Sequence, residues 1–147
     1  MSEDVETAKR LWAHLQGLIR DAGWSFKNIR QFQNNYVGLA YFDKKLVVIA
    51  REFNNEPLSY VHRLAILAHE YAHIDQSLRG VFNTVRDCDY DHPQFMHLAM
   101  RMEQCADNYA IRLLASHGLY DHGLTTDLQP TDLIWYPYWK RYHENKS

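Results

Sequence analysis

Residues 67–75, LAHEYAHID, form the most informative stretch of the sequence. His69 and His73 stand four residues apart, and Glu70 directly follows the first histidine. Side chains four apart on an α-helix leave the same face, about 5–6 Å apart at Cβ. Two imidazoles so placed are able to bind one tetrahedral zinc ion. Glu70 is rotated about 100° from His69, too far for a ligand but close to the open position on the metal.

A carboxylate at that position has a chemical use. A metal lowers the pKa of a bound water from about 15.7 towards about 7, and the carboxylate takes the proton and passes it to the leaving amine. The His-Glu-x-x-His motif of metalloproteases works in this way. The neighbouring helix positions are apolar: Leu64, Ala65, Ile66, Leu67, Ala68, Tyr71 and Ala72. Buried histidines and a buried glutamate need partners or a metal, so the stretch predicts a metal centre rather than a solvated patch.

A catalytic zinc site needs a third protein ligand and one open position. Residues 102–110, MEQCADNYA, offer Glu103, with Asp107 one turn later on the same helix face. The small residues Ala106 and Ala110 allow two helices to approach closely. If the helices cross, Glu103 is able to bind the metal while Asp107 accepts the free ring N–H of a ligand histidine.

The strings HEYAH and EQCADNYAIRLLASHG together resemble the gluzincin metallopeptidases. They are similar to the Glu-x-x-Ala-Asp-x-x-Ala pattern of the HtpX-like zinc proteases and of the IrrE/ImmA-type peptidases of phages and mobile elements. The resemblance implies a minimal zincin fold and one zinc ion. Its ligands would be His69, His73 and Glu103, with Glu70 as general base and acid. Asp107 would support a ligand histidine.

The resemblance covers residues 36–118 and is specific for the class of enzyme but not for the substrate. It also implies that an extended peptide substrate pairs with the strand at Leu46–Ala50 by β-addition. The chain departs from the HtpX-like proteins because it has no membrane segments. It departs from many IrrE-type proteins because it has no helix-turn-helix domain.

Residues 91–100, DHPQFMHLAM, offer a competing third ligand. They resemble the His-Gly-x-x-Phe string of SprT-like proteases, in which His92 would bind the metal, although the glycine is missing and the histidine stands one residue nearer the phenylalanine. A helix-start role is the other interpretation of His92. His117 and Tyr109 are candidates to stabilise the oxyanion of a tetrahedral intermediate, with capping or packing as their alternatives.

The hydrophobic periodicity predicts an α+β fold. We expect an N-terminal helix at residues 5–19 and a β-hairpin at residues 36–50 that turns at residues 43–45. A helix should begin at Asn54 or Asn55, with Pro57 in its first turn, and run to Leu78. A second long helix is expected at residues 93–117. The second long helix packs on the first and carries the third ligand. An aromatic tail, residues 119–147, contains WYPYW and is predicted to cover the core.

The composition fits one domain of 147 residues, with 46% hydrophobic residues for its core. A net charge of -2 argues against a general nucleic-acid binder. The acidic start, the lack of a long apolar run and two cysteines interpreted as reduced thiols predict a cytoplasmic protein. The predicted function is zinc-dependent peptide hydrolysis. The alternatives are a zincin-fold binding or regulatory module that captures a partner, and a SprT-like protease associated with DNA.

Overall fold

The computed structural model describes residues 2–33 and 36–119, and its architecture is mixed α+β, as the sequence predicts. The helices are α1 (Ser2–Asp21), α2 (Tyr60–Leu78), α3 (Asn83–Arg86) and α4 (Phe95–Ser116). The strands are β1 (Ser25–Ile29), β2 (Gly38–Tyr41), β3 (Leu46–Ala50), β4 (Glu52–Phe53) and β5 (Glu56–Pro57). Within the described residues, no helix has the length and apolar character needed to span a bilayer.

The larger sheet has the strand order β1-β3-β2. The predicted hairpin is confirmed, because β2 and β3 pair antiparallel with Leu39 opposite Val48. The sequence did not predict β1, which pairs parallel to β3 with Phe26 opposite Val47. Its sequence SFKNI has a single β-branched residue and three polar side chains. Its strand conformation therefore comes from pairing with β3 and not from a local pattern.

The central position of β3 corrects one expectation about the substrate. Leu46–Ala50 pairs with β1 on one side, and on the other side β2 pairs with its residues 46–49 and the carbonyl of Val37 accepts the N–H of Ala50. A strand paired on both sides has no free N–H and C=O groups to offer a peptide. The expected β-addition to Leu46–Ala50 is therefore wrong for this sheet. Within the described residues, β2 pairs only with β3 and forms an edge of the sheet.

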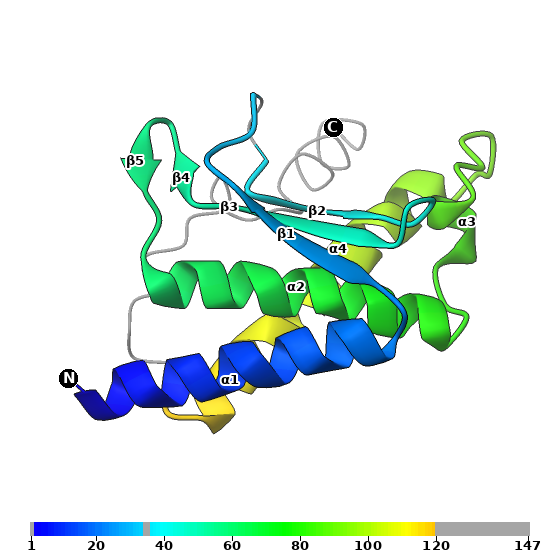
Figure 1. Ribbon diagram of the computed structural model, residues 1–147. Helices are drawn as coiled ribbons and strands as arrows, with labels where there is room; N and C mark the ends of the chain where they lie inside the picture. Colours follow the sequence, from blue (N-terminus) through cyan, green and yellow to red (C-terminus); the bar gives the residue numbers. More distant parts are fainter. Residues whose placement is uncertain (1, 34–35, 120–147) are drawn as a thin grey trace, which may run out of the picture.

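The helices α1 and α2 lie beneath this sheet in Figure 1, and α4 passes behind α2. α2 runs beneath the strands and contacts β2 and β3, α1 packs against α2 and β1, and α4 crosses α2. The main core lies between these elements, and its fully buried side chains include Leu15, Ile19, Val47, Ile49, Leu64, Leu67, Ile74 and Leu114. α2 therefore sits at the centre of the fold, in contact with α1, α4, β2 and β3.

The start of α2 differs from the prediction. Asn54 and Asn55 both have positive φ values, 51° and 64°, and they turn the chain between β4 and β5. Asn tolerates the left-handed region well, so consecutive asparagines favour a tight turn over a helix cap. Ser59 is the N-cap instead, and its side chain accepts the backbone N–H of His62. The second long helix begins and ends within two residues of its predicted bounds.

The predicted aromatic tail begins at Leu119, which is fully buried in the main core. The other residues of that tail, 120–147, lie outside the described residues.

Candidate metal centre

Four polar side chains with acid–base or ligand chemistry are buried between the sheet, α2 and α4. His69, Glu70 and His73 lie on α2 with 2%, 2% and 5% of their surface exposed, and Glu103 on α4 is 5% exposed. The contact between the two helices follows from their sequences, because Ala106 and Ala110 are small, buried residues of α4. Polar groups buried to this extent require hydrogen bonds, opposite charges or a bound ion.

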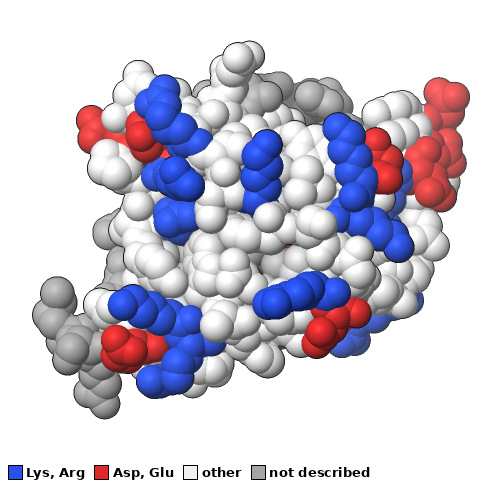
Figure 2. Space-filling model, in the orientation of Figure 1, with Lys and Arg blue, Asp and Glu red and all other residues white. Residues whose placement is uncertain are grey.

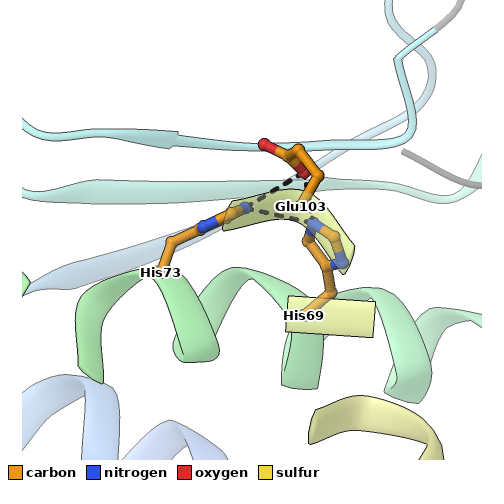
Figure 3. Close-up of side chains that lie close together, drawn as sticks. All are labelled: His69, His73 and Glu103. Carbon is orange, nitrogen blue, oxygen red and sulfur yellow. Dashed lines mark hydrogen bonds and ion pairs between the residues drawn. The ribbon is translucent and has the colours of Figure 1, made fainter. Parts of the chain in front are cut away.

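Three donor atoms converge at this place, as Figure 3 shows. The Nε2 atoms of His69 and His73 are 3.1 Å apart, and Oε2 of Glu103 lies 2.9 Å from the first and 3.3 Å from the second. A tetrahedral zinc ion with bonds of about 2.0–2.1 Å holds neighbouring ligand atoms about 3.3–3.4 Å apart. The triangle therefore has nearly the size of one face of a zinc tetrahedron, and these three residues could hold a metal ion.

The charges in the site agree with this donor set. Burial by itself raises the pKa of Glu103, but the imidazoles of His73 and His69 outweigh it and hold that pKa well below its ordinary value. Burial by itself lowers the pKa of His69, but hydrogen bonds to Asp107 and Glu103 outweigh it and raise that pKa well above its ordinary value. The surroundings thus favour the ionised form of the Glu103 carboxylate and favour positive charge where the imidazoles meet.

Asp107 lies beside His69, as the sequence predicts for a residue that supports a ligand. Its Oδ1 is 2.8 Å from Nδ1 of His69 and accepts the ring N–H. With its proton held on Nδ1, the neutral ring of His69 has its lone pair on Nε2, the atom that a metal ion would bind. The other carboxylate oxygen of Asp107 is buried without a hydrogen-bond partner, and burial raises the pKa of Asp107.

Glu70 differs from Glu103 and Asp107 because its carboxylate forms no hydrogen bond with either histidine. Its Oε2 is buried without a hydrogen-bond partner, and burial raises the pKa of this carboxyl group. Strand β2 passes directly over it: a Cβ atom added to Gly38 would lie 3.1 Å from Glu70 Oε2. A buried carboxylate with an unoccupied acceptor and a raised pKa is suited to take up a proton.

Gln76 was not predicted as part of the site. Its Oε1 lies 3.0 Å from Nδ1 of His73, and its Nε2 donates to the backbone carbonyl of Met102 at 3.1 Å. The signal was present in the sequence, because Gln76 follows His73 by three residues and so stands on the same helix face. A polar residue at this position of a buried helix needs a partner for the same reason as the two histidines.

The three remaining candidates lie outside the cluster. His92 accepts the backbone N–H of Gln94 through Nδ1, ahead of α4, and does not belong to the His69–His73–Glu103 group. His117 is exposed at the C-terminal end of α4, where its Nδ1 bonds the carbonyl of Leu113. It follows Glu103 by fourteen residues, about 21 Å along the helix.

Tyr109 packs its ring against Tyr71, with 6.1 Å between ring centroids. Tyr71 follows His69 by two residues and so projects about 200° round α2 from it. Neither Tyr109 nor His117 thus belongs to the His69–His73–Glu103 group. His117 caps a helix and Tyr109 packs between two helices, which were the alternative interpretations of both residues.

Comparisons of the chain with protein-family models, with curated proteins and with solved structures found no match. The function is therefore inferred from the chemistry of the site, in which His69, His73 and Glu103 form a buried group that could hold a metal ion.

Proposed function

We propose that the protein is a zinc-dependent peptidase with a minimal zincin fold. The observation that carries this proposal is the buried, unpartnered carboxylate oxygen of Glu70 beside a triangle of three ligand atoms. A metal site that serves only stability has no use for a further carboxylate that binds neither the metal nor a ligand, because such a group costs free energy in a buried position. Such a cost is typical of catalytic groups.

The residues divide the chemistry between them. When bound by His69, His73 and Glu103, zinc supplies a Lewis acid that polarises a peptide carbonyl and acidifies water. Glu70 takes the proton of the attacking water at its free Oε2 and later delivers it to the leaving amine. Asp107 holds the ring of His69 in the tautomer that presents Nε2 to the metal.

The substrate is placed on β2 in this proposal. This strand is an edge of the sheet within the described residues, and its Gly38 lies against Glu70. An extended peptide that pairs with the edge of β2 would run past the base and the metal ligands. In this proposal the strand that pairs with the substrate is therefore β2, the neighbour of β3 in the hairpin, and not β3 itself.

Replacement of Glu70 by glutamine tests the enzyme directly. Glu70→Gln keeps the shape of the side chain and all three ligands but removes the group that carries the proton. We expect peptidase activity to fall by about 10²–10⁴-fold. Zinc content should stay at one equivalent, and the melting temperature should not fall, because a buried unpaired charge is removed.

The matched control is Glu56→Gln, the same substitution at an exposed residue of β5. It should leave activity, zinc content and melting temperature unchanged. Purified protein that folds but takes up no zinc would end the proposal. So would a Glu70→Gln variant with wild-type activity on peptides that the wild type cleaves.

A second function, capture of a partner by a zincin-fold module, is favoured by one observation. The site side chains are almost fully covered, with His69 and Glu70 only 2% exposed, whereas catalysis requires access for a peptide. A wild-type protein that binds zinc but cleaves nothing in a broad peptide library, and whose biological effect survives Glu70→Gln, would establish this function instead.

The SprT-like alternative finds less support. Its third ligand would be His92, which is not part of the buried cluster. On the face drawn in Figure 2, lysines and arginines stand in separate groups, and several of these groups have acidic neighbours. A nucleic-acid surface is typically a continuous basic stripe, which this face lacks.

A further inference from the structure

Gln76 joins the two helices that carry the metal ligands. It belongs to α2, three residues after His73, and its amide nitrogen bonds the carbonyl of Met102 on α4. Met102 directly precedes Glu103 in the chain. The side chain of Gln76 is 7% exposed, so both of its hydrogen bonds lie inside the protein. One amide therefore contacts a ligand histidine and the backbone beside the ligand glutamate.

The two contacts of Gln76 determine where the ring proton of His73 lies. The carbonyl of Met102 only accepts hydrogen bonds, so the NH₂ group of the amide must face it. The carbonyl oxygen Oε1 then faces Nδ1 of His73 at 3.0 Å. Because Oε1 only accepts, Nδ1 must carry a proton, and in the neutral ring Nε2 then keeps the lone pair that a metal needs.

The chemical type of this partner matters as well as its position. Asp107 orients His69 in the same way, because its carboxylate Oδ1 accepts the Nδ1–H of that ring at 2.8 Å. The buried site already contains the carboxylates of Glu70, Glu103 and Asp107, and a further negative charge there would be costly to bury. A neutral amide orients His73 without adding charge.

We propose that Gln76 is a positioning residue of the metal centre, which fixes the tautomer of His73 and holds this ring in register with Glu103. The inference rests on metal binding by His69, His73 and Glu103, as proposed above. It does not depend on peptide hydrolysis, because Gln76 acts on the ligand before any substrate is present.

The test compares zinc affinity among purified full-length variants by competition with a chelator. Gln76→Met has similar length and removes both hydrogen bonds, and we expect it to bind zinc about 10–100-fold more weakly. Gln76→Glu keeps an acceptor for His73 but loses the donor to Met102, and we expect it to bind at least about tenfold more tightly than Gln76→Met. Gln104→Met, beside Glu103 on α4, is the matched control and should stay within about threefold of wild type.

A spectroscopic measurement separates a positioning role from a general structural one. In the zinc-loaded wild type, the Nδ1–H proton of His73 should appear as a slowly exchanging ¹H resonance that correlates with a ring ¹⁵N. Gln76→Met should lose this resonance, while the corresponding signal of His69, held by Asp107, should remain.

The outcomes distinguish the inference from the proposed function. A wild type that takes up no zinc overturns both. If the wild type binds zinc while Gln76→Met keeps the same affinity and the His73 resonance, Gln76 has no positioning role and the peptidase proposal stands. If Gln76→Met does not fold, Gln76→Glu decides: loss of the His73 resonance in that variant contradicts the inference, because its acceptor is still present.

Discussion

A single methyl group on Gly38 should disturb both the packing and the proposed peptidase activity. Its Cβ would lie 2.6 Å from Cγ2 of Ile66, 3.1 Å from Oε2 of Glu70 and 3.3 Å from Cγ of Glu70. The first distance is too short for two non-bonded carbon atoms, so the side chain of Ile66 or the strand β2 must shift. Overpacking of this kind costs about 1–3 kcal/mol of stability, or about 3–10 °C in melting temperature for a chain of this size.

The effect on catalysis has a separate cause. The new methyl also presses on the carboxylate of Glu70, which has to move by a few tenths of an ångström. Displacement of a catalytic group on this scale costs about tenfold in kcat. The three atoms nearest to the new methyl belong to none of the proposed metal ligands, so zinc affinity should stay within a few-fold of wild type. Thermal unfolding, peptidase assays and chelator competition on Gly38→Ala measure the three quantities separately.

A double-mutant cycle with Ile66→Ala identifies the contact responsible. In the Ile66→Ala background Cγ2 is absent, and we expect Gly38→Ala to cost about 1–2 kcal/mol less than in wild type. Activity should remain low, because the contact with Glu70 persists. Gly17→Ala is the matched control: a Cβ added to this helical glycine would meet nothing within 4 Å, so the change should stabilise by about 0.5–1 kcal/mol. An equal cost of Gly38→Ala in both backgrounds would refute the packing argument.

Three further predictions concern the metal ligands. Glu103→Ala should abolish stable zinc binding, whereas His92→Ala should stay within a few-fold of wild type in chelator titrations; the reverse result would favour the SprT-like alternative. Asp107→Ala should weaken zinc binding by about 10–100-fold, since His69 loses the acceptor that holds its ring, and an unchanged dissociation constant would contradict this role. Removal of zinc by a chelator should lower the stability of the wild type by about 2.7 kcal/mol when the free zinc concentration was 100 times the dissociation constant. The same treatment should leave the stability of Glu103→Ala unchanged in calorimetry.

Local geometry explains which parts of the site could be predicted from the sequence. The pairs His69–His73 and Glu103–Asp107 each lie on one helix, and a helix fixes the relative direction of side chains four residues apart. The hairpin of β2 and β3 was likewise local, because its two strands are rich in apolar residues and join through a short turn. These features depend on neighbours in the chain and need no knowledge of the remaining fold.

Contacts between distant segments were decided only by the tertiary structure. β1 is a strand because β3 lies beside it, and this pairing in turn removes the free edge that β3 was expected to offer. Gly38 lies over Glu70, and Gln76 reaches Met102, although 32 and 26 residues separate the partners along the chain. No periodic pattern encodes such contacts, since they form when hydrophobic burial brings α2, α4 and the sheet together. The sequence by itself thus determined which side chains share a helix face, and packing decided which faces meet.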